Sequence, residues 1–316
     1  MSTHPIETAK YILPTAAVRS LYDATREWVE ARCPGAIIWG YQRMGKTRAI
    51  RHLRLGLRCE WPDLFTFEMP CRSYRISGEG NFFSDLLAAA EHAIPDSGSP
   101  AQKRNRLIEF LVDKATSTGE DRLVLFIDDA QRLTEIQFEW LMDIHTDLDK
   151  RGVAFIVLLV GQPELAKRKE AYCKTGQMQI VGRFMVHSRR FMGLTSAREV
   201  QQCLKEYDTA EFPQGSGCSF SRHYFPRAWN QGWRLADHAQ DFWEAIRLEA
   251  EGKKIDKVDE VPMAYFTRMV GILLTKYGEK AVSDPEINAA RIKDIVRRSN
   301  CIEALVAKTL SEGNSK

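Results

Sequence analysis

The sequence lacks the long apolar stretch that a membrane-spanning helix requires. Its longest apolar run, residues 153–160, is only as long as a strand, so no association with a membrane is expected. The first residues contain no basic segment followed by an apolar one, and we therefore expect no signal peptide. The seven cysteines are scattered without a Cys-x-x-Cys pair. This argues against a zinc site and a disulfide framework and indicates a reducing, cytoplasmic location.

The charge of the chain is nearly balanced, with 45 Lys and Arg against 42 Asp and Glu. Basic residues are nevertheless concentrated in two places. Residues 43–58 contain six Lys or Arg and no acid, and a second group consists of Lys167, Arg168, Lys169, Lys174, Arg183, Arg189 and Arg190. Such local excess is compatible with binding to a phosphate backbone, although a solvated helix face has the same composition.

One motif, Gly40 to Thr47, matches the phosphate-binding pattern Gly-x-x-x-x-Gly-Lys-Thr. An apolar run precedes it at residues 36–39, and helical periodicity follows from Ala49. In such a loop the backbone N–H groups surround the phosphates, the lysine reaches the β- and γ-phosphates, and the threonine hydroxyl binds Mg²⁺. The predicted nucleotide-contacting residues are Gly40, Gln42, Arg43, Met44, Gly45, Lys46, Thr47 and Arg48.

A second motif follows the apolar run at residues 123–127, which has the composition of a strand buried on both faces. The run ends in Asp128-Asp129-Ala130-Gln131. A carboxylate at the tip of such a strand completes the Mg²⁺ shell beside the loop threonine, and we assign that role to Asp128. Asp129 is then placed to activate the attacking water. A helix N-cap is the alternative for Asp129.

The remaining pattern predicts an α/β fold. A third apolar strand at residues 153–160 ends at Gly161-Gln162, and two further strands are expected at residues 64–69 and 184–191. Helical spacing occurs between them at residues 82–93, 101–116 and 138–149. Alternating strands and helices predict a parallel five-stranded sheet between helices, with the site at the carboxyl ends of the strands.

Together these motifs resemble AAA+ P-loop ATPases, and in particular the AAA+ regulators of transposition of the TnsC/TniB group, over about residues 10–245. The resemblance implies that the strand at residues 153–160 lies between the two motif strands. It also implies four regions: an N-terminal segment near the adenine (residues 1–33), an AAA+ core (34–195), a small helical lid (196–250) and a helical C-terminal extension (251–316). Within the extension, helices are expected at residues 264–277 and 286–306.

The resemblance also implies three further catalytic residues. Gln162 takes the sensor 1 position beside the γ-phosphate. Arg183 takes the place of the arginine finger, which reaches the ATP of the neighbouring subunit, and Arg234 takes that of the sensor 2 arginine in the lid. An ordinary salt bridge is the alternative for each arginine.

The second acidic position departs from the family pattern. The family usually has Glu there, and Asp129 is one methylene shorter. A carboxylate set further back positions water less well, so we expect slow hydrolysis, suited to a timer or switch.

DNA contacts are implied by the resemblance in the loops after the second strand and in the next helical region. The candidate residues there are Arg72, Arg75, Lys103 and Arg104, with Arg106 close by. They would contact phosphates of double-stranded DNA without sequence preference. No helix-turn-helix or zinc finger is evident.

The predicted function is that of an ATP- and Mg²⁺-dependent ATPase that forms a homo-oligomeric ring or helical filament on target DNA. It would link a target-selection protein of the TniQ type to the transposase. The guanine-reading Asn-Lys-x-Asp signature is missing, which favours ATP. The alternatives are a helicase-loader-like or secretion-associated AAA+ ATPase and, from another class, a small-molecule kinase.

Overall fold

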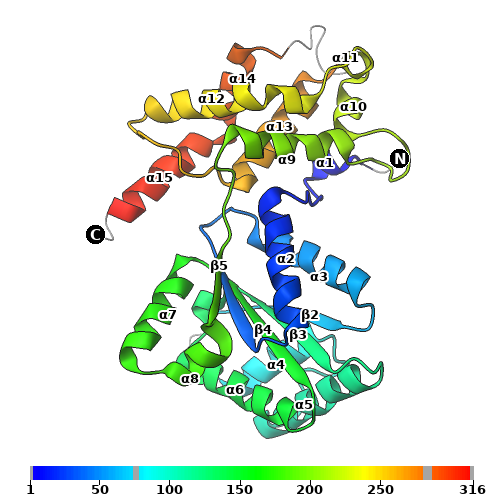
Figure 1. Ribbon diagram of the computed structural model, residues 1–316, viewed down its shortest axis with the longest axis vertical. Coiled ribbons are helices and arrows are strands. Elements are labelled where there is room, and N and C mark those ends of the chain that lie inside the picture. Colours follow the sequence, from blue (N-terminus) through cyan, green and yellow to red (C-terminus); the bar gives the residue numbers. More distant parts are fainter. Residues whose placement is uncertain (1–2, 74–77, 280–286, 314–316) are drawn as a thin grey trace. The chain divides into compact units, whose positions relative to one another are not determined.

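A parallel sheet of five strands organises the part of the chain that carries both motifs (Figure 1). The strands are β1 (Gly35–Trp39), β2 (Phe65–Pro70), β3 (Arg122–Asp128), β4 (Ala154–Gly161) and β5 (His187–Arg190). Their order is β2-β3-β4-β1-β5, and every pair is parallel. β4 therefore lies between the two motif strands, as predicted, and both motifs lie at the carboxyl edge of the sheet.

The computed structural model describes residues 3–73, 78–279 and 287–313, and the side chains up to residue 310. The chain divides into two compact units. The sheet unit comprises Ser20–Tyr41 and Lys46–Phe191, and the helical unit comprises Met1–Arg19, Gln42–Gly45 and Met192–Lys316. Among the described residues, no helix is both long and apolar enough to cross a membrane.

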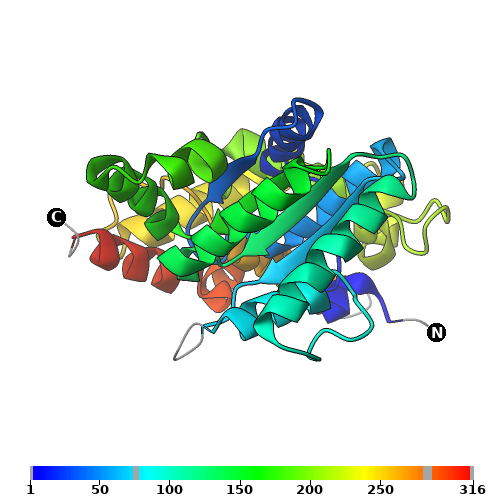
Figure 2. The ribbon, with the colours of Figure 1, turned by 90° about the horizontal axis from the view of Figure 1, so that it is seen from below.

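The sheet is buried because its central strands are continuous apolar runs. Alternate residues such as Phe67, Leu125 and Leu159 share one cluster with helices on one face. Their neighbours Phe126 and Leu158 point to the other face and are also fully buried. Figure 2 shows helices along both faces. The helices of this unit are α3 (Lys46–Glu60), α4 (Glu79–Ala89), α5 (Pro100–Thr116), α6 (Glu135–Asp149), α7 (Pro163–Thr175), α8 (Met178–Ile180) and most of α2 (Ala16–Glu30).

The last predicted strand is shorter than expected. Residues 184–191 were expected to be extended, but Val181–Met185 form one turn of π-helix, η2, and β5 begins only at His187. Phe184 and Met185 are fully buried in the core of the sheet unit. Their burial on a helical turn explains why an apolar run was mistaken for a strand.

The helical unit has its own core. Its elements are α1 (Pro5–Thr8), α9 (Ala197–Thr209), α10 (Phe220–Tyr224), α11 (Pro226–Asn230), η3 (Leu235–His238), α12 (Ala239–Glu251), α13 (Met263–Tyr277), α14 (Ala289–Ser299) and α15 (Cys301–Gly313). Tyr207, Phe242, Phe266 and Ile295 are buried in one continuous cluster. The expected lid and the expected extension are thus packed together in this unit.

The prediction of one continuous helix over residues 286–306 is wrong. Residue 286 itself lies outside the described part of the chain. Two helices, α14 and α15, meet at Asn300, whose backbone is left-handed with φ 61°. Asn tolerates this conformation better than most residues. The buried Ser299 hydroxyl donates to the Val296 carbonyl and accepts from the N–H of Cys301. These bonds stabilise the break without interrupting the apolar periodicity.

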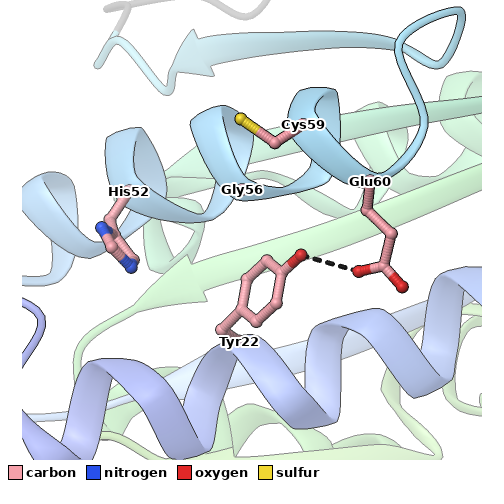
Figure 3. A pocket seen from close by; sticks show the side chains of 5 residues that line it. All are labelled: Tyr22, His52, Gly56, Cys59 and Glu60. Atoms are coloured by element: carbon pink, nitrogen blue, oxygen red, sulfur yellow. Dashed lines mark hydrogen bonds between the residues drawn. The ribbon is translucent and has the colours of Figure 1, made fainter.

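A surface pocket between α2 and α3 is lined by Tyr22, His52, Gly56, Cys59 and Glu60 (Figure 3). The Tyr22 hydroxyl donates to the Glu60 carboxylate at 2.8 Å. Burial and this hydrogen bond raise the pKa of Tyr22 to about 12. A Cβ atom on Gly56 would lie 2.4 Å from the Tyr22 ring. Gly56 therefore allows the ring to lie against α3.

This close approach predicts the sign of a substitution. Ala in a helix interior normally stabilises by about 1 kcal/mol relative to Gly, whereas overpacking costs about 1–3 kcal/mol. We expect Gly56→Ala to lower the free energy of unfolding by roughly 1 kcal/mol. Gly271→Ala in α13, where nothing lies within 4 Å of the added Cβ, is the control and should raise it. Equal stabilisation by both variants in chemical denaturation would contradict the prediction.

Candidate active site

Lys46 opens α3 at the carboxyl edge of the sheet. Its ammonium group donates to the main-chain carbonyls of Gly40 at 2.7 Å and Tyr41 at 2.8 Å. Burial lowers the pKa of Lys46 below its ordinary value. The nearby carboxylates of Asp128, Asp129 and Glu164 offset only part of this effect. A partly desolvated cation next to the loop is suited to binding phosphate oxygens.

Thr47 and Asp128 lie in direct contact, although 81 residues separate them in the sequence. The Thr47 hydroxyl donates to the Asp128 carboxylate at 2.5 Å. The second oxygen of Asp128 accepts from the N–H of Asp129 at 2.9 Å, which orients the carboxylate. One hydroxyl and one carboxylate are hard oxygen ligands of the kind that Mg²⁺ takes when phosphates and water supply the rest. The two residues fit a Mg²⁺ site of this kind.

No group of three or more His, Cys, Asp and Glu side chains in the described ranges could hold a metal ion by itself. A Mg²⁺ ion at Thr47 and Asp128 would need further oxygen ligands from a bound nucleotide and from water.

The two glycines of the loop have different physical roles. A Cβ on Gly40 would lie 2.2 Å from the carbonyl oxygen of Phe191, so the backbone passes too close for any larger residue. Gly45 has φ +98°. Positive φ values within a short segment are typical of backbone nests, whose N–H groups converge on an anion. Arg43 also has a positive φ, of 64°.

Asp129 lies beside two polar neighbours that its sequence position does not reveal. Its carboxylate accepts from the Gln131 side-chain amide at 3.1 Å and lies 3.7 Å from the Arg132 guanidinium. Asp129 precedes the short η1 helix (Ala130–Arg132) but makes no side-chain capping bond. The N-cap hydrogen bond considered as the alternative is thus not formed.

Gln131 connects the tips of two neighbouring strands. Its amide nitrogen donates to Asp129, and its amide oxygen accepts from the main-chain N–H of Gln162 at 3.0 Å. A Cβ on Gly161 would lie 2.6 Å from that same oxygen. The sequence motif contains Gln131 but does not reveal this role, because the N–H of Gln162 comes within hydrogen-bond distance of its side chain only in the folded chain.

Arg183 lies near the amino end of β1, whereas Lys46 lies beyond its carboxyl end. Its main chain passes the first residue of β1, where a Cβ on Gly35 would lie 3.2 Å from the Arg183 carbonyl. Since a strand advances about 3.3 Å per residue, the length of β1 places Arg183 roughly 15 Å from the phosphate-loop edge. Its guanidinium donates to α6, at the Met142 carbonyl and the Thr146 hydroxyl.

Arg234 belongs to the helical unit. Its guanidinium lies 3.7 Å from the centre of the Trp229 ring and donates to the main-chain carbonyls of Trp229 and Trp233. A guanidinium group that stacks on an aromatic ring and donates two hydrogen bonds has a well-defined position. Its sensor 2 role stays a prediction.

The predicted DNA contacts have partners within the chain. Arg75 lies outside the described residues. The others form an ion pair of Arg72 with Asp85 at 3.3 Å, a hydrogen bond from Lys103 to Ser84 at 2.7 Å, and ion pairs of Arg104 with Glu79 and Asp143. Lys103 and Arg104 thereby join α5 to neighbouring helices, and their contact with DNA also stays a prediction.

Comparison with known proteins agrees with this geometry. Residues 31–168, which include both motifs, match a family described as the AAA domain. A search of curated protein sequences gives no match. The strand order, the two motifs and the family match define an AAA+ P-loop ATPase fold, as predicted.

Several solved structures are remotely similar. The Aeropyrum pernix ORC2 protein in its ADPNP-ADP complexes has 14% identity, a TM-score of 0.48, and coverage of 97% of this chain and 99% of that chain. Drosophila ORC bound to DNA has 11% identity, a TM-score of 0.45, and coverage of 88% and 59%. Domain III of the Thermotoga maritima replication initiation protein DnaA has 15% identity, a TM-score of 0.45, and coverage of 94% and 98%. Likenesses this remote carry no weight in the assignment of function.

The contact between Thr47 and Asp128 predicts a metal-dependent effect. Thr47→Val keeps the shape but removes the hydroxyl, so we expect ATP affinity in Mg²⁺ to fall on the order of tenfold or more. Thr47→Ser keeps the hydroxyl and should bind nearly as the wild type does. Titration with a fluorescent ATP analogue measures both variants. In EDTA the difference between them should disappear, and a Thr47→Val protein that binds normally in Mg²⁺ would contradict the assignment.

Proposed function

We propose that this protein is an ATPase that binds ATP and Mg²⁺ at the loop from Gly40 to Thr47. The observation that carries the proposal is the 2.5 Å contact between the Thr47 hydroxyl and the Asp128 carboxylate, directly beside Lys46. When ATP binds, the Lys46 ammonium group would donate to phosphate oxygens in place of the Gly40 and Tyr41 carbonyls. A bound Mg²⁺ would neutralise charge on the phosphates.

Asp129 is the proposed base that orients the attacking water and takes its proton. Its side chain is short, and its carboxylate accepts from the Gln131 amide and lies beside the Arg132 guanidinium. A carboxylate with these two neighbours is less free to orient a water molecule at a γ-phosphate. We therefore expect slow turnover, which suits a switch better than a motor.

The proposed assembly is supported by the place of Arg183 in the sheet unit. An arginine at the amino edge is too far from the carboxyl edge to contact ATP of its own chain. An arginine finger at this position would therefore have to contact the ATP of a neighbouring subunit. A head-to-tail interface of this kind generates a ring when the rotation closes and a helical filament when it does not.

The finer proposal is that the oligomer forms on double-stranded DNA and regulates transposition. Its support is the resemblance of the motifs to the TnsC/TniB group over about residues 10–245 and the local basic excess at residues 43–58. The transposase and a target-selection protein of the TniQ type are the proposed partners. ATP would favour assembly because it binds the assembled state more tightly than the free subunit.

The test is sizing and negative-stain imaging with a non-hydrolysable ATP analogue, with and without duplex DNA. Rings or filaments that require both ligands, and that Lys46→Ala abolishes, would support the proposal. A monomer under every condition would contradict the oligomer. If the protein assembles with the analogue alone and DNA changes nothing, the proposed ATPase activity stands and the proposed role as a DNA-binding regulator is wrong.

Mixing two inactive variants tests whether Arg183 acts on the neighbour. Lys46→Ala removes ATP binding but retains Arg183, whereas Arg183→Ala retains ATP binding. Each alone should hydrolyse ATP poorly. In a mixture, the ATP site of an Arg183→Ala subunit can face the intact Arg183 of a Lys46→Ala subunit, so turnover should recover in part.

Arg151→Ala is the matched control, because Arg151 forms a surface ion pair with Glu109 in the same unit. It should hydrolyse ATP as the wild type does. A mixture of Lys46→Ala and Arg183→Ala that stays as inactive as its components would argue against action between subunits.

A further inference from the structure

The middle of the phosphate loop is held by the helical unit. Residues Gln42–Gly45 belong to that unit, and the Arg43 carbonyl accepts from the main-chain N–H of Ala264 at 3.0 Å. Met44 is 1% exposed. A Cβ on Gly193 would lie 3.0 Å from the Met44 sulfur, which shows how closely the backbone passes the loop.

Two short segments form the support against which Met44 packs. Leu194 and Val261 make an antiparallel bridge, with main-chain hydrogen bonds of 3.0 and 2.7 Å. A Cβ on Gly193 would lie 2.1 Å from the Val261 carbonyl, so the two segments touch without room for a side chain. The position of the loop therefore depends on the position of this bridge.

The buried side chain of Glu260 stabilises the bridge between Leu194 and Val261. Its side chain is 1% exposed, and one carboxylate oxygen accepts from the main-chain N–H of Gly193 at 3.2 Å. The other oxygen accepts from the ammonium group of Lys308 at 3.0 Å. Lys308 lies on α15, the last helix of the chain. A buried carboxylate is stable only when it is paired and hydrogen-bonded, so removing the Lys308 ammonium group is unfavourable.

We infer that Lys308 and Glu260 are positioning residues for the phosphate loop. This inference rests on the proposed ATP binding and assigns a role to the C-terminal helix. Without the ammonium group, the buried Glu260 carboxylate loses a charged partner that helps to hold it in place. This loss loosens its hydrogen bond to Gly193 and the bridge that supports Met44. A loop that holds its binding conformation for only a fraction of the time binds ATP more weakly by that fraction.

The decisive variant is Lys308→Met, which keeps most of the side-chain stem but removes the charge. We expect its dissociation constant for ATP and Mg²⁺ to rise on the order of five- to tenfold, through the reduced fraction of competent loop. Lys308→Arg retains the cation and should stay within about twofold of the wild type. Titration with a fluorescent ATP analogue measures all variants, and thermal unfolding reports their stability.

A double variant distinguishes positioning from general stability. Glu260→Gln combined with Lys308→Met removes both charges and keeps an acceptor for the N–H of Gly193. It should bind ATP more tightly than Lys308→Met alone. If Lys308→Met does not fold, the double variant carries the test. Affinity lowered in the double variant as far as in Lys46→Ala would then overturn the inference.

The control is Lys293→Met, the same substitution at an ion pair of α14 with Glu249, at 3.3 Å. It should leave ATP affinity unchanged. If Lys308→Met binds as the wild type does, or if Lys293→Met weakens binding equally, the inference is wrong and the proposed function stands. If the wild type itself binds no ATP, the proposed function fails instead.

Discussion

The hydrogen bond between Thr47 and Asp128 is the constraint on which the rest of the site depends. It requires that β1 and β3 end at the same edge of the sheet, and in this strand order β4 lies between them. The central strands are continuous apolar runs, which a parallel sheet covered by helices on both faces can bury. The positions of Thr47 and Asp128 at the carboxyl ends of the strands therefore depend on the packing of the core. Lys46 and Asp129 take their places from the same two strand ends.

A second constraint is that the phosphate loop is shared between two folding units. Lys46 and Thr47 belong to the sheet unit, whereas the residues before them pack with the helices that follow the sheet. The backbone conformation of Arg43 and Gly45 is therefore set by contacts far along the chain, at Gly193 and Ala264. The inferred role of Lys308 and Glu260 in positioning the loop depends on these contacts.

Local patterns in the sequence predicted the parallel sheet and the meeting of Thr47 with Asp128, and the family resemblance predicted the place of β4 between the two motif strands. They succeeded because burial leaves continuous apolar runs and because phosphate loops need glycines at fixed spacing. The break at Asn300 and the π-helical turn before β5 escaped prediction, since neither interrupts the apolar pattern. The roles of Gln131 and Glu260 were missed for a different reason. Each depends on partners that only tertiary structure brings within hydrogen-bond distance.

The central claim is that this site binds Mg·ATP and is completed by a neighbouring subunit. A crystal or cryo-EM structure with a non-hydrolysable ATP analogue, Mg²⁺ and duplex DNA tests it most directly. The account predicts the phosphates at Lys46, the metal ion at Thr47 with Asp128 in its shell, and Arg183 of the next subunit directed at the γ-phosphate. An analogue bound away from the loop, or an assembly in which Arg183 faces no nucleotide, would contradict it.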